Sequence, residues 1–131
     1  MNKKLIKKPL IIVLVETAGA INLGSVARLC ANYEVDELRL VKPFCSSDDP
    51  EARRMAIKGE EFLEKAKIFP TLVDALADCH RVIATCGRIN HGAIPLESTD
   101  KALPWLMESY GSAPIAIVFG RESRGLTNQE L

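Results

Sequence analysis

An unbroken run of six apolar residues near the start of the chain, LIIVLV at positions 10–15, restricts the fold more than any other feature. Valine and isoleucine favour extended backbone, and a strand without polar alternation must be covered on both of its faces. Glu16 ends the run, which is too short for a signal-peptide core or a membrane span. The segment therefore predicts a buried strand of a parallel sheet.

Further strand-length apolar runs alternate with helical patterns along the rest of the chain. Asp49-Pro50 and Thr71 are typical of helix starts, because each supplies a capping side chain before a helical pattern. This alternation predicts one α/β domain over residues 1–131, with a mostly parallel sheet and helices on both faces. Strands are expected at 38–41, 68–69, 82–86 and 115–119, and helices at 23–33, from 50 to Gly59, from 71, and at 101–110.

The charges are balanced, since 17 basic and 17 acidic side chains give a net charge of zero. Such a chain does not attract nucleic acid through a bulk positive field, although a local basic patch can still bind it. Arg53-Arg54 forms one basic cluster. Lys3, Lys4, Lys7 and Lys8 form another, which solvated lysines beside a strand explain best.

The four cysteines, Cys30, Cys45, Cys79 and Cys86, lie in or near apolar runs, and no two have C-x-x-C spacing. We expect free thiols in a reducing compartment. The two histidines of the chain do not cluster with them, so no metal site is expected. Without a visible signal peptide or membrane span, the expected location is the cytoplasm.

Ligands of an open parallel sheet bind beyond the carboxyl ends of its strands. One predicted loop there begins with Thr85-Cys86-Gly87, small residues that either allow close approach of a ligand or simply end a strand. In another, Gly120 follows a buried strand directly, and three charged residues come before Gly125. We interpret this segment as functional, because such charges cannot belong to the core. The three candidate loops are 16–22, 85–90 and 120–125.

The first of these loops leads into the first predicted helix. Gly19 and Gly24 have the spacing of a phosphate-binding loop, but Ser25 stands in the place of its lysine, so hydrolysis of nucleoside triphosphates is not expected. Asn22 either caps the helix or belongs to the site. Arg28 is either a surface residue or a second site residue on the same helix.

Two signatures in these loops resemble those of a known family. Asn22-x-Gly24-x-x-x-Arg28 is similar to the first signature of the SpoU/TrmH family of SPOUT RNA methyltransferases, and Phe119-Gly120-x-Glu122-x-x-Gly125-Leu126 to the second. Residues 26–32 and 49–56 resemble the TrmJ-like branch, which methylates ribose 2′-hydroxyls in the tRNA anticodon loop. The resemblance covers nearly the whole chain, and both signatures occur in order.

The resemblance implies the SPOUT α/β-knot fold, in which the C-terminal segment threads into a trefoil knot. It also implies S-adenosyl-L-methionine as methyl donor, RNA (tRNA above all) as substrate, and a homodimer, with no DNA or membrane partner. The third family signature has no counterpart before Leu131, and a capping box at 127–130 begins a helix that does not continue. We therefore expect a truncated domain that lacks the knotted tail.

The resemblance also implies roles for single residues. The family assigns Arg28 to the ribose hydroxyl; with a pKa above about 12, arginine is a poor base, so we expect it to hold the adjacent phosphate and stabilise charge. Asn22 would position Arg28 or the ribose, and Glu122 would orient its loop or Asn22. Cofactor contacts are implied for Thr85, Cys86, Gly87 and Gly120, and contacts with RNA phosphates or with acids across the dimer for Arg121 and Arg124.

Three other functions stay open at this stage. They are methylation of rRNA, a non-catalytic RNA- or nucleotide-binding domain of the same fold, and a phosphate-binding α/β enzyme. The joint presence of Asn22, Arg28 and Glu122 disfavours the non-catalytic domain. The missing lysine of the first loop disfavours the phosphate-binding enzyme.

Overall fold

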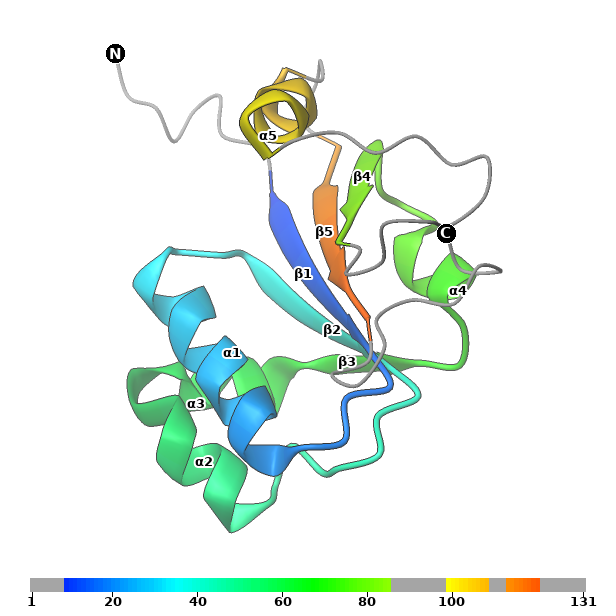
Figure 1. The fold of residues 1–131 in the computed structure, drawn as a ribbon. Helices are drawn as coiled ribbons and strands as arrows, with labels where there is room; N and C mark the ends of the chain where they lie inside the picture. The colour runs from blue at the N-terminus through cyan, green and yellow to red at the C-terminus, as the bar shows by residue number, and fades with distance from the viewer. Residues whose placement is uncertain (1–8, 86–98, 109–112, 121–131) are drawn as a thin grey trace.

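The computed structural model describes residues 9–85, 99–108 and 113–120, which form a single sheet with its covering helices (Figure 1). Five strands lie in the order β3-β2-β1-β5-β4, and every neighbouring pair is parallel. In chain order the elements are β1 (Leu10–Val15), α1 (Ala20–Asn32), β2 (Glu37–Val41), α2 (Pro50–Ala56), the 3-10 turn η2 (Ile57–Gly59), α3 (Glu60–Lys65), β3 (Lys67–Phe69), α4 (Leu72–Leu76), β4 (Arg81–Ala84), α5 (Thr99–Met107) and β5 (Ile115–Phe119).

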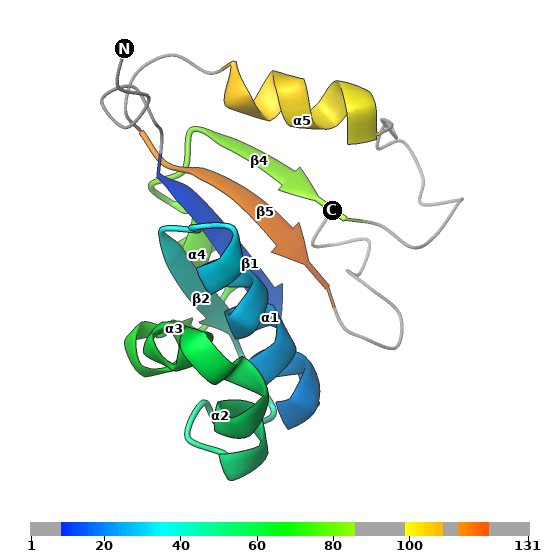
Figure 2. The ribbon, with the colours of Figure 1, turned by 90° about the vertical axis from the view of Figure 1, so that its left-hand side faces the viewer.

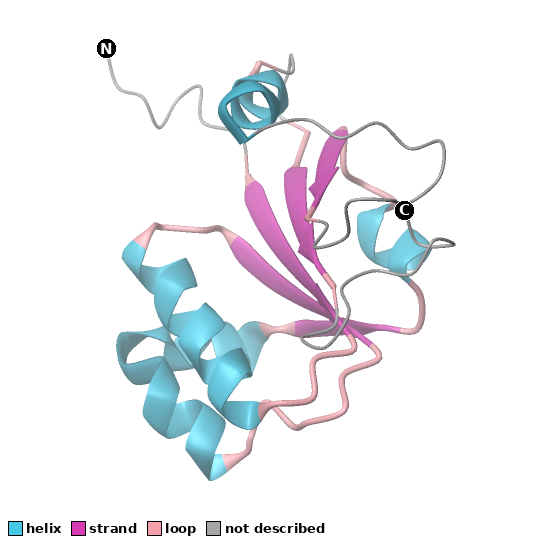
Figure 3. Ribbon diagram, viewed as in Figure 1, coloured by secondary structure: helices cyan, strands magenta, loops and turns pink. Residues whose placement is uncertain are grey.

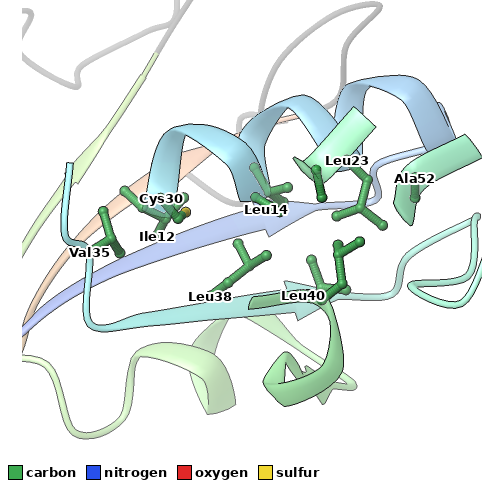
Figure 4. Close-up of a cluster of buried hydrophobic side chains, with 11 residues drawn as sticks. Ile12, Leu14, Leu23, Cys30, Val35, Leu38, Leu40 and Ala52 are labelled. Carbon is green, nitrogen blue, oxygen red and sulfur yellow. The ribbon is translucent and has the colours of Figure 1, made fainter. Parts of the chain in front are cut away.

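β1 is the central strand, and its two faces contribute to two separate cores. On one face Ile12 and Leu14 pack with α1, α2 and α3 (Figure 4). On the other face Ile11, Val13 and Val15 pack beneath α4. Figure 3 shows these helices on opposite sides of the sheet. The predicted parallel sheet with helices on both faces is confirmed.

Small residues bring α1 and α2 close together. A Cβ atom added at Gly24 would collide with the carbonyl oxygen of Ala52 and lie 2.8 Å from Cβ of Met55. Gly59 makes a similar approach to the carbonyl of Ala27. The glycine of the first signature therefore has a packing role, since a side chain there would force the two helices apart.

The helix ends agree only in part with the expectations. Asp49 accepts a hydrogen bond from the Glu51 amide at 2.9 Å, and Thr71 accepts one from Asp74 at 3.1 Å, as predicted. However, α1 begins at Ala20, three positions before the expected start, and its N-cap is a glycine without a side-chain hydrogen bond. Asn22 lies inside the first turn, so its interpretation as the cap is wrong.

Other boundaries shift by a few residues. β4 begins at Arg81 and ends at Ala84, whereas the prediction placed it at 82–86. α5 continues through Pro104 and contacts β4 along its length (Figure 2). Arg81 joins the two, because its guanidinium lies 4.5 Å from the Trp105 ring centre and donates to the Trp105 carbonyl. The predicted capping box at 127–130 and any knotted tail lie outside the described residues.

A buried arginine attaches α4 to the sheet, which the sequence patterns did not suggest. Arg39 is only 5% exposed, and it donates to the Ala75 carbonyl at 2.7 Å and to both carboxylate oxygens of Asp78 at 2.7 and 2.9 Å. Glu37 accepts a hydrogen bond from Nε of Arg39 at 2.7 Å, and the Arg39 guanidinium lies over the ring of Phe69. The hydrogen bond from Arg39 holds the pKa of Asp78 down to about 2.

The close contact between α1 and α2 makes the substitution Gly24→Ala informative. It is expected to lower the free energy of unfolding by about 1–3 kcal/mol, as overpacking does in a tight core. At an open helix position the same exchange raises stability by about 1 kcal/mol, so the sign is diagnostic. Urea unfolding followed by circular dichroism measures it. The matched control, Ser25→Ala, should change stability by no more than about 0.5 kcal/mol. A more stable Gly24→Ala variant would contradict this packing.

The ion pair between Asp78 and Arg39 predicts a pH dependence of stability. Because the folded-state pKa of Asp78 is lowered from 3.8 to about 2, its contribution is complete above pH 4 and is lost as the pH falls towards 2. Asp78→Asn should therefore lower the Tm at neutral pH and flatten its decline below pH 4. Thermal unfolding across this range tests it, with Asp74→Asn, at an exposed acid of α4, the helix that precedes Asp78, as control. Parallel curves for Asp78→Asn and the unmodified protein would disprove it.

Candidate functional site

The strand order places the beginnings of the three candidate loops at neighbouring strand ends. β5 lies between β1 and β4, so Glu16, Gly120 and Thr85 leave adjacent parallel strands at one edge of the sheet. Adjacent strands lie about 4.8 Å apart, which puts these positions within reach of one small ligand. β1 and β5 are neighbours in the sheet but distant in sequence, the arrangement at which ligand crevices form in open α/β sheets.

Thr85 and Gly120 directly follow the neighbouring strands β4 and β5 at this edge. The backbone amide of Thr85 donates to the Val118 carbonyl at 2.9 Å, and its hydroxyl lies 3.2 Å from the same oxygen. Both hydrogen-bond donors of Thr85 are therefore engaged by the sheet, so a ligand would meet its hydrogen-bond acceptors. The remaining predicted contacts lie outside the described residues and stay predictions: Cys86, Gly87, Arg121, Glu122 and Arg124.

Two non-glycine residues have positive φ angles directly after β1 and β2. Glu16 has φ 51° and Lys42 has φ 46°. The Glu16 amide donates to the Val41 carbonyl at 2.8 Å, and the Lys42 amide donates to the Phe69 carbonyl at 3.2 Å, so both positions are held by the sheet. Such backbone costs of order 1–3 kcal/mol. It is not confined to this edge, because Glu34 and Ile57 also have positive φ angles, 55° and 52°.

The loop after β2 lies against the loop after β1. Thr17 is 3% exposed, and its carbonyl accepts from the Phe44 amide at 2.9 Å and from the Cys45 thiol at 3.6 Å. The Phe44 side chain is nevertheless 67% exposed. Sequence reasoning missed Phe44 and Lys42, although their place directly after a predicted strand, on the same edge as the candidate loops, could have marked them.

The two residues of the first signature lie at different heights on α1. Asn22 is exposed in the first turn, whereas Arg28 is exposed eight residues after the helix begins at Ala20. At 1.5 Å per residue, Arg28 lies about 12 Å along the axis from that start. Arg28 is also the one charged residue of α1. The exposed face of the helix carries Ile21, 50% exposed, and Leu29, 52% exposed, with Tyr33 of the C-cap 76% exposed, and it also carries the exposed polar residues Asn22 and Asn32.

The three described cysteines do not form disulfides. Cys30, Cys45 and Cys79 are free, as predicted, although the last two are only half-buried. Burial raises the pKa of Cys30 to about 11, and burial beside Asp78 raises that of Cys79 to about 11, so both stay protonated at neutral pH. Over the described ranges, we find no group of three side chains able to hold a metal ion. Within those same ranges, no helix is long and apolar enough to span a membrane.

The chain is similar to RNA methyltransferases over nearly its whole length. Its relatives include proteins named tRNA (cytidine/uridine-2'-O-)-methyltransferase TrmJ from Citrobacter koseri and Klebsiella pneumoniae, each 40% identical over 121 residues, which are 92% of this chain and 49% of the relative. The chain thus spans about half the length of the curated relatives it matches.

Solved structures share the fold. The crystal structure of TrmJ from Z. mobilis matches with a TM-score of 0.81 and 33% identity, over 92% of this chain and 53% of that chain. The SpoU methyltransferase AviRb from Streptomyces viridochromogenes matches with a TM-score of 0.65 at 17% identity, over 95% of this chain and 47% of that chain, which shows the fold alone. The model of the SpoU rRNA Methylase family matches residues 9–131, and the chain belongs to this family.

Proposed function

We propose that this protein transfers a methyl group from S-adenosyl-L-methionine to a ribose 2′-hydroxyl of tRNA. One observation carries this proposal: the first signature lies on α1, which follows β1, and the second begins with Phe119 and Gly120 at the end of the neighbouring β5, in a chain 40% identical over most of its length to tRNA 2′-O-methyltransferases. Because tRNA is present in the cytoplasm, we propose that the protein acts there. Single-stranded loops expose the 2′-hydroxyl, which also distinguishes RNA from DNA.

The described part of the edge fits the cofactor. Thr85 presents acceptor groups, which suit an adenine amino group, because its donors are engaged by Val118. Gly120, beside it, has no side chain to obstruct close approach. When bound, the cofactor supplies an electrophilic methyl group. The ribose hydroxyl is a weak nucleophile, so the protein must orient it and stabilise the charge that develops as its proton leaves.

Arg28 can stabilise this developing charge. A second copy of the chain would explain why Arg28 lies on the exposed face of α1, away from the start of the helix. We propose a homodimer in which the outer face of α1 is covered, since exposed large apolar side chains with a single charge and uncharged asparagines are typical of an interface. The guanidinium would hold a phosphate beside the target ribose through paired hydrogen bonds. Asn22, one and two-thirds turns earlier on the same helix, would position the ribose.

A second candidate substrate is rRNA, because the description of the family names it. Incubating the purified protein with S-adenosyl-L-methionine and either tRNA or rRNA from cells lacking it, followed by mass-spectrometric mapping of ribose methylation, separates the two. We expect methylated tRNA. Cofactor binding in calorimetry with no methyl transfer to either RNA would refute catalysis and favour an RNA-binding domain.

Arg28→Ala tests the role of the guanidinium. Removing one group that stabilises transition-state charge lowers kcat by roughly 100- to 1,000-fold. We expect that loss in tRNA methylation, with cofactor affinity in calorimetry changed by less than about two-fold because Arg28 is placed at the RNA. Arg28→Lys should recover little activity, since a lysine cannot make the paired hydrogen bonds. Unchanged activity in Arg28→Ala would remove this residue from the mechanism.

Leu29→Asp tests the dimer. A carboxylate at the centre of an apolar interface must be desolvated, so we expect the variant to be monomeric by light scattering and to lose methylation. Val73→Asp places the same charge at an exposed position on α4, on the opposite side of the sheet, and should keep the mass and activity of the unmodified protein. A dimeric, active Leu29→Asp protein would show that this face is not the interface.

A further inference from the structure

We propose that Phe44 is a stacking platform for a base of the substrate RNA, adjacent to the nucleotide that is methylated. The proposal rests on the function proposed above, and it adds a substrate-binding residue outside both signatures. Phe44 follows β2, the neighbour of β1, so it lies at the same edge as Glu16 and Gly120. With about 4.8 Å between strands, the β2 exit lies about 10 Å from the β5 exit.

The backbone holds Phe44 in a defined position. Its amide donates to the Thr17 carbonyl, and the next residue, Cys45, donates its thiol to the same oxygen. Lys42, two positions earlier, is bonded to β3 through its amide and keeps a left-handed φ of 46°. Pro43 lies between Lys42 and Phe44, and its ring fixes its own φ angle. A ring on such a loop loses little conformational freedom on binding, which favours affinity.

The exposed ring is available to a ligand at this edge of the sheet. Phe44 is 67% exposed, whereas Thr17, whose carbonyl accepts from the Phe44 amide, is 3% exposed. Lys42, two residues earlier on the same loop, is also exposed and adds a cation to it. An aromatic face beside a cation is how proteins bind single-stranded RNA, with the ring stacking on a base and the cation meeting the backbone. Of the acids that follow Phe44 in this loop, Asp48 pairs with Arg53 and Asp49 caps α2.

The experiment measures binding of a fluorescein-labelled RNA hairpin carrying an anticodon-loop sequence, by fluorescence anisotropy. Phe44→Ala is expected to weaken affinity by roughly 5- to 150-fold, the range that one base–aromatic stack provides. Phe44→Trp should preserve affinity, and Phe44→Leu, which is apolar but not aromatic, should resemble alanine. Melting temperature and dimer mass should not change, because the ring is exposed. Val73→Ala removes another exposed apolar side chain and serves as the control.

A second hairpin whose loop nucleotides lack bases identifies the contact. The unmodified protein should bind this abasic loop more weakly than the complete one, whereas Phe44→Ala should bind the two alike. Equal affinity of Phe44→Ala and the unmodified protein for the complete loop overturns the proposal, as does a Phe44→Leu variant that binds fully. Loss of the dimer in Phe44→Ala would instead assign the ring to a second copy of the chain. Methylation of tRNA by the unmodified protein tests the proposed function separately.

Discussion

The burial of β1 on both faces is the constraint on which the rest of the structure depends. Its apolar residues alternate between two cores, so helices are required on both sides of the sheet. Its hydrogen-bonding edges are occupied by β2 and β5, which aligns the ends of three strands. Since parallel strands end at the same edge, the segments that follow them begin there, and the partners of β1 decide which candidate residues leave neighbouring strands.

The two faces of the sheet are closed in different ways. On the face of α1, small residues at Gly24 and Gly59 let helices approach backbone to backbone, which fixes the height of α1 and the residues it carries. On the opposite face, α4 has five residues and offers little apolar area, and Arg39 completes the contact through the Ala75 carbonyl and Asp78, while Glu37 of its own strand holds the guanidinium in place. A buried cation is stable there because carboxylates and a carbonyl satisfy its donors.

The functional edge combines rigidity with exposure. Glu16 and Lys42 leave their strands in strained backbone that the sheet hydrogen bonds maintain, so the loops begin in fixed directions. Phe44 and Asn22 then project towards solvent from anchored positions. A flexible loop would lose conformational entropy when RNA binds, so the anchored backbone favours the RNA contact that we propose for Phe44.

Local patterns alone determined much of this protein. The bounds of β1 and β5, the caps at Asp49 and Thr71, the α/β class and the family signatures all follow from short stretches of sequence, because propensity, capping and periodicity act between near neighbours. Only the tertiary structure decided that β5 lies beside β1, that Arg39 is buried, that Asn22 is not the cap and that Phe44 is exposed. Each of these depends on contacts between residues far apart in the chain, which no local pattern encodes.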